Sequence, residues 1–259
     1  MGKAEQHSGL AAIVLAAGKG ERMNSDLPKV LHPVCGRPML AFVLEACAEV
    51  GCAEMIVVIG HQAELVRSTF ADSPYALTWV EQTPQLGTGH ALMVCRPELE
   101  RLSGPVLVLA GDGPLIRGST LRRLLDTHRR GRAACTLATS ILEDPGRYGR
   151  VVRDQAGEVV GIVEFLDADE QQRSIKEVNV SVYCFDAAAL TATVGRLTND
   201  NAKGEYYLTD VLGLLAGDGK KLAAVAAVPS EEVLSINTVE QLRQVEAILA
   251  RRQSGGVRC

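Results

Sequence analysis

A run of glycines and cations near the start of the chain suggests phosphate chemistry. It reads Leu15-Ala16-Ala17-Gly18-Lys19-Gly20-Glu21-Arg22-Met23 and continues to Leu27-Pro28-Lys29. The glycines let backbone N–H groups approach an anion closely, and two lysines and an arginine add three positive charges. A polyphosphate needs such donors and charge. A surface turn with solvated charges is the alternative, but the full run favours phosphate binding.

Neither standard nucleotide motif is present. Met23 stands where the dinucleotide motif G-x-G-x-x-G has its third glycine, and the sequence holds no G-x-x-x-x-G-K-[S/T] run. It also holds no Ser/His/Asp grouping and no metal-ligand spacing of histidines, which gives hydrolase chemistry little support.

Two further segments could take part in binding, one of a metal ion and one of a base. Gly111-Asp112-Gly113-Pro114 follows an apolar run, so its carboxylate is expected at the carboxyl edge of a sheet, where it could hold Mg²⁺. An ordinary turn is the alternative. The other segment reads Gln82-Thr83-Pro84-Gln85-Leu86-Gly87-Thr88-Gly89-His90-Ala91, and its glycine backbone and the Gln82 amide could read a base edge. The alternative is a helix N-terminus capped by Thr88, with His90 a packed or surface side chain.

The elements that must position these residues alternate between strands and helices. Apolar runs of strand length occur at 10–16, 55–59, 105–110 and 133–139, and a helix is predicted at 39–50 with Pro38 at its start. Because the runs are apolar on both faces, they indicate a mainly parallel sheet covered on both sides. The predicted fold class is α/β, a Rossmann-like doubly wound sheet with a small added β lobe.

The pattern changes near residue 144. Segments 149–153 and 159–164 predict a hairpin around a turn at 154–157, and strands are predicted at 178–185 and 222–228. Residues 210–215 look helical, and 238–252 predict an amphipathic helix with Thr238 as N-cap. No Pro/Ser-rich linker intervenes, so we predict one domain over 10–252. Disordered tails are expected at 1–9 and at 253–259, the latter with an exposed Cys259.

Composition narrows the class of protein. Of 259 residues, 47% are hydrophobic and 22% are charged, which indicates a globular protein with a sizeable core. A net charge of −4 argues against a nucleic-acid binder with a basic surface. No stretch of the sequence reaches the ~18 apolar residues of a membrane span, and the polar start predicts no secretory signal. The seven cysteines are scattered and never spaced CxxC, so we expect mostly buried thiols in a reducing cytoplasm.

Taken in order, five motifs resemble those of the sugar-1-phosphate nucleotidyltransferases. They are Leu15-Ala16-Ala17-Gly18…Arg22-Met23…Leu27-Pro28-Lys29-Val30-Leu31-His32, Gln82…Leu86-Gly87-Thr88-Gly89-His90-Ala91, Gly111-Asp112…Pro114-Leu115-Ile116, Tyr148-Gly149-Arg150-Val151 and Glu205-Tyr206-Tyr207-Leu208-Thr209-Asp210. Within that family the sequence is similar above all to the uridyltransferase domains of bacterial bifunctional N-acetylglucosamine-1-phosphate uridyltransferase/glucosamine-1-phosphate acetyltransferases. The likeness covers 10–252 and implies the nucleotide-diphospho-sugar transferase fold. It divides the domain into a nucleotide-binding half (10–143), a sugar-binding half (144–237) and a C-terminal helix (238–252).

The resemblance implies roles for individual residues. The nucleotide would be held by Leu15, Ala16, Ala17, Gly18, Gln82, Gly87 and Thr88. The triphosphate would be neutralised by Arg22 and Lys29, and Mg²⁺ would be held by Asp112 and Asn237. The sugar phosphate would be surrounded by Gly149, Glu164, Asn179 and Tyr207. By residue type alone, these four and Asn237 are ordinary solvated, core or turn residues.

Four places depart from the family pattern. Ala110 replaces a polar or aromatic residue, and Gly113 replaces a larger one. Phe165-Leu166 stand where polar or charged residues are usual, and Asn179-Val180-Ser181 replaces Asn-Thr-Gly. These changes bear on the identity of the sugar more than on the nucleotide chemistry.

The implied activity is Mg²⁺-dependent uridylyl transfer from UTP to N-acetylglucosamine-1-phosphate, which gives the cell-wall precursor UDP-N-acetylglucosamine and pyrophosphate. The attacking phosphate is already an anion, so catalysis needs positioning and charge neutralisation, not a protein nucleophile. The alternatives are another sugar-1-phosphate, dTTP in place of UTP, or a non-catalytic nucleotide-sugar-binding regulator. No hexapeptide repeat follows Arg252, so acetyl transfer is not expected, and the oligomeric state stays open.

Overall fold

A nine-stranded sheet forms the centre of the protein in a computed structural model that describes residues 9–23, 25–226 and 228–255. Its main path runs β11-β7-β10-β6-β1-β4-β5. These strands are β1 (Ala11–Leu15), β4 (Glu54–Ile59), β5 (Leu77–Glu81), β6 (Pro105–Ala110), β7 (Cys135–Ile141), β10 (Glu177–Asp186) and β11 (Leu222–Val225). All run parallel except β10, which is antiparallel to both of its neighbours. The predicted α/β class is therefore confirmed.

The predicted hairpin extends this sheet on one side. Its strands are β8 (Arg150–Arg153) and β9 (Val159–Val163), and β8 pairs with β10 through Arg150 and Val178. A separate small ladder joins β2 (Pro33–Val34) to β3 (Arg37–Pro38). The added β lobe thus shares β10 with the main sheet, which couples the lobe directly to the centre of the fold.

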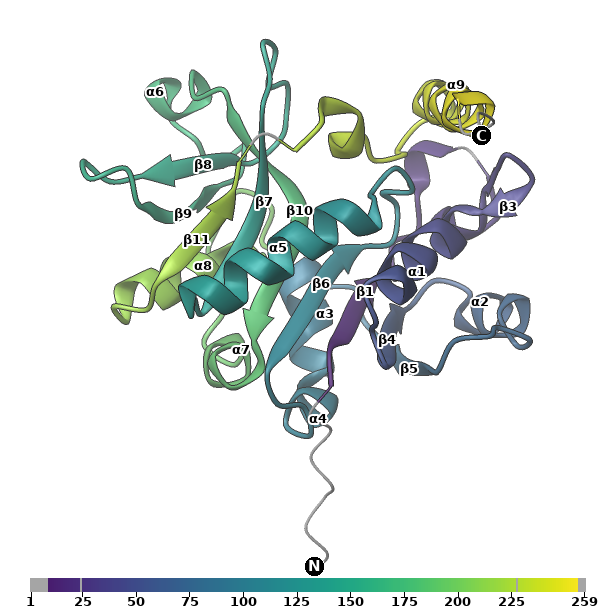
Figure 1. The fold of residues 1–259 in the computed structure, drawn as a ribbon, viewed down its shortest axis with the longest axis horizontal. Helices are drawn as coiled ribbons and strands as arrows, with labels where there is room; N and C mark the ends of the chain where they lie inside the picture. The colour runs from purple at the N-terminus through teal and green to yellow at the C-terminus, as the bar shows by residue number, and fades with distance from the viewer. Residues whose placement is uncertain (1–8, 24, 227, 256–259) are drawn as a thin grey trace, which may run out of the picture.

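Helices cover both faces of the sheet (Figure 1). On one face lie α1 (Met39–Glu49) and α5 (Gly118–Gly131). On the other lie α3 (Thr88–Val94), α4 (Arg96–Leu99), α7 (Ala187–Val194) and α8 (Asp210–Gly217). The remaining helices are α2 (Ala63–Thr69), α6 (Glu170–Arg173), α9 (Val239–Gly255) and the short 3₁₀ turns Glu21–Met23, Lys29–Leu31 and Ser230–Val233.

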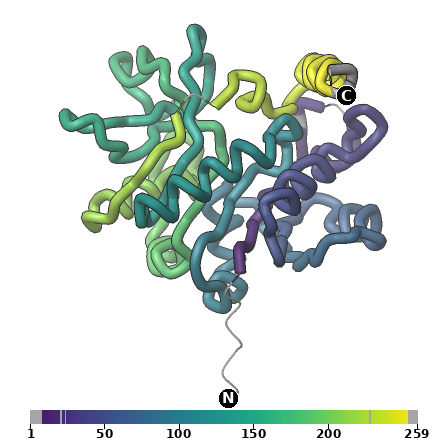
Figure 2. Tube along the Cα trace, in the orientation of Figure 1, coloured from purple at the N-terminus to yellow at the C-terminus, as the bar shows by residue number. Residues whose placement is uncertain are grey.

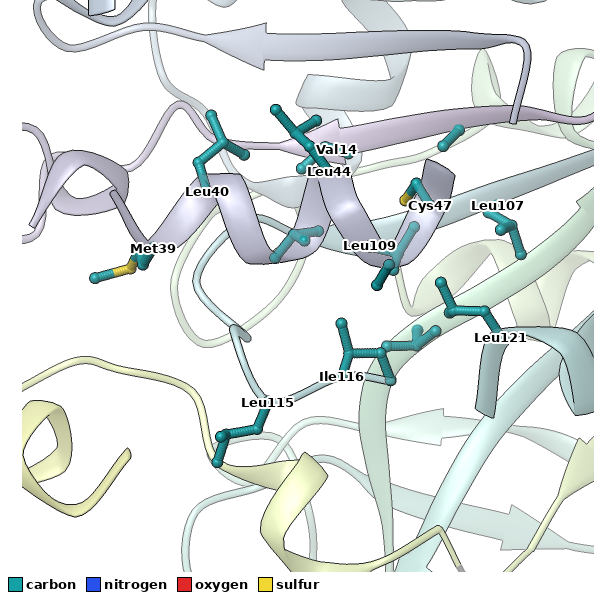
Figure 3. Packing of buried hydrophobic residues seen from close by; sticks show 14 of the residues in the cluster. Val14, Met39, Leu40, Leu44, Cys47, Leu107, Leu109, Leu115, Ile116 and Leu121 are labelled. Atoms are coloured by element: carbon teal, nitrogen blue, oxygen red, sulfur yellow. The ribbon is translucent and has the colours of Figure 1, made fainter. Parts of the chain in front are cut away.

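Alternate strand residues supply two hydrophobic cores. Val14 and Leu109 pack with α1 and α5, as Figure 3 shows beside Leu44 and Cys47, whereas Ile13 packs on the opposite face. Both-face burial explains why β1 and β6 read as continuous apolar runs, since each side chain of such strands leaves water. The last helix, α9, returns to the N-terminal half beside β2 (Figure 2).

Several elements differ from the sequence predictions. The strand predicted at 222–228 ends at Val225, which pairs with Ala138 of β7. Val228 still contacts β7 but out of that register, because it donates its N–H to the Thr139 carbonyl at 3.0 Å. The helix predicted to end at 252 continues to Gly255, so the tail does not begin at residue 253. Edge strand β5 was not predicted, because its half-buried residues mix polar and apolar types.

Other sequence predictions concern the surface and the thiols. Of the tails expected at 1–9 and 253–259, residues 1–8 and 256–259, including Cys259, fall outside the described residues. The six cysteines in the described part are free, and four of them, Cys47, Cys95, Cys135 and Cys184, are buried. Across the described ranges, no helix combines the length and the apolar character needed to cross a membrane.

Candidate functional site

The loops that follow β1, β5 and β6 meet at the carboxyl edge of the sheet and line a cavity of about 470 Å³. This is the edge at which open α/β sheets bind ligands. The lining includes the predicted residues Leu15, Ala16, Ala17, Gly18, Lys29, Gln82, Gly87, Thr88, Asp112, Glu164 and Asn179. The sequence motifs, although far apart in the chain, are therefore brought to one place.

Four predicted residues form a tight polar cluster beside the cavity, which we call the cation cluster: Arg22, Lys29, Asp112 and Asn237. The Lys29 ammonium forms an ion pair with Asp112 Oδ2 and donates to Asn237 Oδ1 at 2.9 Å. The Arg22 guanidinium donates to the same amide oxygen at 2.9 Å. The Lys29 and Asp112 side chains are only 12% and 20% exposed, so solvent screens their attraction less than it screens a surface pair.

Backbone and side-chain contacts fix the two oxygen-bearing residues of this cluster. Asp112 lies two residues after the end of β6, and its carbonyl accepts the N–H of Ile236 at 3.0 Å, which ties the two segments together. Asn237 donates its Nδ2 to Ser235 Oγ at 3.0 Å and its backbone N–H to Gln241 Oε1 at 2.7 Å. These bonds turn the amide oxygen of Asn237 toward Lys29.

The donor set of the cluster fits a magnesium ion. A carboxylate oxygen and an amide oxygen both contact one ammonium, so a single cation can touch both of them. Mg²⁺ prefers hard oxygen ligands and commonly takes one or two from protein, with substrate phosphates and water completing its shell. The described residues hold no cluster of three His, Cys, Asp or Glu side chains that would suit another metal site.

Close backbone packing builds the side of the cavity that the sequence analysis assigns to the nucleotide, which we call the nucleotide side. Gly89 donates its N–H to the Tyr206 carbonyl at 2.7 Å, and Tyr206 donates to the Leu86 carbonyl at 2.8 Å. At Gly87, φ is +109°, and an added Cβ would lie 2.5 Å from the Tyr206 oxygen, so only glycine fits. Thr88 accepts the N–H of Leu208 at 3.1 Å and does not cap α3, whose N-cap is Gly87.

Two glutamine side chains form hydrogen bonds on this side of the cavity. Gln82 donates its Nε2 to the Gly87 carbonyl at 2.8 Å, and the same nitrogen lies 3.1 Å from His90 Nδ1. Gln85 donates to the Ala17 carbonyl at 2.7 Å and so joins the loop after β5 to the loop after β1. Gln85 was not among the predicted site residues, because its role depends on a contact between loops that no spacing in the sequence reveals.

Side chains build the opposite side of the cavity. Glu164 accepts the Thr209 hydroxyl at 3.0 Å, and burial raises the pKa of its carboxyl above the usual value. Asn179 donates its backbone N–H to the Gly149 carbonyl at 2.9 Å and its amide to the Tyr183 hydroxyl at 2.6 Å. Thr209 was also missed by sequence reasoning, although it lies inside the most specific motif.

Tyr207 lies apart from the main cavity. It lines a neighbouring hollow of about 70 Å³ together with Glu164, Phe165 and Leu166, so Glu164 stands between the two spaces. Burial and the nearby Asp167 carboxylate raise the pKa of Tyr207 to about 12, which keeps its phenol neutral. Gly149 lies behind Glu164, where an added Cβ would meet the carboxylate oxygens at 3.5 and 3.6 Å.

The departures from the family pattern lie around these side chains. The Phe165 ring is flanked by the guanidinium groups of Arg147, Arg150 and Arg173 at 5.3, 5.7 and 5.0 Å, so an aromatic ring takes the place of a polar partner. Ser181 has φ of +58°, a left-handed conformation that favours glycine. At Gly113 an added Cβ would meet only the Ala110 oxygen at 3.9 Å, so that glycine is not required for space.

Arg150 anchors the loop that carries Gly149. Its side chain is almost fully buried, and it donates to the carbonyls of Gly146 at 2.8 Å, Tyr148 and Arg173. Among the described residues it forms no ion pair with a carboxylate, so backbone carbonyls compensate for the buried charge. Burial lowers the pKa of this guanidinium below its usual value.

The chain is similar to known proteins over most of its length. The family of the "MobA-like NTP transferase domain" matches residues 12–194. The Bifunctional protein GlmU of Heliobacterium modesticaldum is 48% identical over 241 residues, which are 93% of this chain and 52% of that protein. The proteins of the same name from Pelobacter propionicus and Streptococcus equi subsp. zooepidemicus are 48% and 47% identical over 94% and 93% of this chain, and 53% and 52% of their own lengths.

The chain thus spans about half the length of the curated relatives that it matches. The matched residues include the cavity loops after β1, β5 and β6, together with Glu164 and Asn179, whereas Tyr206 and Leu208 lie beyond the match. The chain therefore belongs to the MobA-like NTP transferase family.

Proposed function

We propose that the protein transfers a uridylyl group from UTP to N-acetylglucosamine-1-phosphate. Its membership of a nucleotidyltransferase family supports the reaction type, and its likeness to proteins named Bifunctional protein GlmU supports this substrate pair. The free thiols of the described cysteines suit a reducing compartment, so a cytoplasmic location belongs to the same proposal.

The observation that carries the proposal is the cation cluster between two differently built sides of one cavity. On one side, glycine backbone and Gln82 offer the donors and acceptors that a base requires. On the other, Glu164 and Asn179 offer polar side chains to a sugar. The phosphates of both substrates would then meet at Lys29 and Asp112.

In the proposed reaction, a phosphate oxygen of the sugar-1-phosphate forms a bond to the α-phosphorus of UTP. The bond from that phosphorus to the β-phosphate oxygen breaks, and pyrophosphate leaves with the electron pair. Lys29 and Arg22 neutralise the charge that develops on the leaving group. Asp112 and Asn237 are the residues that would hold Mg²⁺, which when bound supplies further positive charge at the phosphates.

A second candidate keeps the reaction but changes the acceptor to another hexose-1-phosphate. The Phe165 ring, packed among three arginines, supports it because this change lies at the hollow beside Glu164. Ala110 supports it as well, because it lines the main cavity with only a methyl group.

The test is pyrophosphate release with UTP and Mg²⁺, in parallel with N-acetylglucosamine-1-phosphate, glucosamine-1-phosphate and glucose-1-phosphate. We expect release with the first sugar and none after EDTA is added. Release with a different sugar would move the substrate and keep the mechanism. UTP binding without release from any sugar would contradict the proposal and favour a nucleotide-sugar-binding regulator.

A further inference from the structure

The amide nitrogen of the Gln82 side chain makes two contacts that hold the side chain in place. The side chain lines the cavity and is 4% exposed. Its Nε2 lies 2.8 Å from the Gly87 carbonyl oxygen and 3.1 Å from His90 Nδ1. A primary amide nitrogen carries two hydrogens, which is the number needed for these two contacts.

The chemistry of the two partners fixes the orientation of the amide. A carbonyl oxygen can only accept, so the atom that faces Gly87 must be the nitrogen of Gln82. Because that nitrogen donates, His90 Nδ1 must accept, and the neutral ring then carries its hydrogen on Nε2. A rotated amide would instead place its oxygen against the Gly87 oxygen and the His90 lone pair.

The oxygen of Gln82 is thereby left for a ligand. Among the contacts of the described residues, Oε1 accepts no hydrogen bond, and the residue belongs to the cavity lining. An acceptor at this place suits a base whose ring edge carries an imide N–H, as uracil and thymine do. Cytosine carries a lone pair at the corresponding ring nitrogen, which an acceptor repels.

We propose that His90 is a positioning residue that locks the Gln82 carboxamide with its oxygen toward the base, and so selects pyrimidines with an imide N–H over cytosine. This inference deepens the proposed function and rests on it for the presence of a nucleotide in the cavity. His90 itself touches no reacting atom. Its ring lies 6.1 Å from the Tyr206 ring, which places it in the contact between the two nucleotide-side motifs.

The loss of His90 as acceptor would free the amide in part. The Gly87 carbonyl would still favour the original orientation, so one of two constraints would remain. One hydrogen bond corresponds to about a fivefold change in an equilibrium, ~1 kcal/mol. The rotated amide presents N–H groups to the cavity, which cytosine can accept and the uracil imide cannot.

The experiment compares the affinities for UTP and CTP by calorimetry in wild type, His90→Phe and His90→Asn. Phenylalanine keeps a ring beside Tyr206 without an acceptor, whereas the asparagine oxygen can take the place of Nδ1. We expect the preference for UTP over CTP to fall about fivefold in His90→Phe and to be restored in His90→Asn. Thermal unfolding of each variant separates a folding defect from a change in this ratio, which a purely structural role would not move.

Pyrophosphate release is measured on the same proteins to keep the two proposals apart. An unchanged UTP/CTP ratio in His90→Phe, with release from UTP intact, would overturn the role of His90 and leave the proposed function standing. A ratio that shifts as expected, without release from any sugar phosphate, would support His90 and contradict the proposed function. Wild type without any preference between UTP and CTP would overturn the inference outright.

Discussion

The two sides of the cavity are built on different physical principles. On the nucleotide side, the segment around Gly87 meets Tyr206 through backbone hydrogen bonds, and there is no room for even one added carbon. On the sugar side, Glu164, Asn179 and the Phe165 ring project from the β8–β9 hairpin region and from β10, and they act through side-chain atoms.

This difference decides where the chain can change. A backbone wall tolerates few substitutions, because each added atom must displace another segment. A side-chain wall can exchange its groups while the main chain stays in place. Of the four departures from the family pattern, Ala110 and Ser181 line the main cavity, Phe165-Leu166 line the hollow beside Glu164, and none lies at Gly87, Thr88 or Gln82.

The largest effect is expected where both sides meet. Replacing Asp112 with alanine should lower kcat by about 10²–10³-fold, because the reaction of either substrate depends on charge held at this point. The fold should persist, since the side chain is partly exposed and lies in a loop. Steady-state pyrophosphate release measures the change, and Asp126→Ala, an exposed position on α5, is the matched control. Turnover close to wild type would contradict the assignment of Asp112.

The next largest effect tests the backbone wall. Gly87→Ala should raise the KM for UTP more than about tenfold or destabilise the protein by ~2 kcal/mol, because φ is +109° and the new Cβ meets the Tyr206 oxygen. The KM for the sugar phosphate should change much less. Gly213→Ala is the control, because an added Cβ there meets nothing within 4 Å and φ is ordinary. Equal effects of the two substitutions would remove the contrast between the walls.

A smaller and opposite pair of effects is expected at Glu164. Burial raises the folded-state pKa of this carboxyl above 4.5, so the folded protein binds the proton more tightly than the unfolded chain does. Ionisation therefore reduces stability as pH rises above 4.5, and Glu164→Gln should show a higher Tm at pH 7. That gain should vanish as the pH falls below 4.5, where the wild-type carboxyl is protonated in both states.

The same substitution should harm function. We expect the KM for the sugar phosphate to rise about tenfold, because a hydrogen bond to a charged group contributes more than one to a neutral amide. Asp154→Asn, in the exposed turn between β8 and β9, is the control for carboxylate loss on this lobe. A KM that stays at the wild-type value would exclude Glu164 from sugar binding.

The smallest effect concerns backbone strain on the side-chain wall. Ser181→Gly should stabilise the protein by ~1 kcal/mol, because φ of +58° is costly for a residue with a Cβ. Ser174→Gly, at a helix end with φ of −74°, should not stabilise it. Chemical denaturation measures both, and a destabilised Ser181→Gly variant would show that side-chain contacts outweigh the strain.

Much of the fold was predictable because burial leaves a local signal. The strand Pro105–Ala110 is apolar throughout, since helices cover both of its faces, and the sequence analysis placed it at the same residues. Edge strand β5 lacks that signal, because it has only one neighbour and its residues are half-exposed. The predicted end of α9 was wrong because the residue types of Gln253 and Ser254 are compatible with either a helix or a tail.

The site was predictable in its parts and unpredictable in its connections. Motif spacing identified Asp112 and Lys29 separately, but the ion pair between them depends on β1 and β6 being neighbours in the sheet. Nothing in the sequence indicates that Gln85 reaches Ala17 or that Arg150 is buried among backbone carbonyls. Charged side chains are seldom buried, so rules based on composition place such an arginine at the surface.

The link between Asn237 and the two cations has a consequence for folding during synthesis. Lys29 and Arg22 stand 208 and 215 positions before Asn237, so the cation cluster joins segments that are synthesised far apart in time. A growing chain can fold its early strands as they emerge, yet Arg22 and Lys29 cannot form their bonds to Asn237 before that residue has been synthesised. The cation cluster would therefore be complete only after the segment that leads into α9 has left the ribosome.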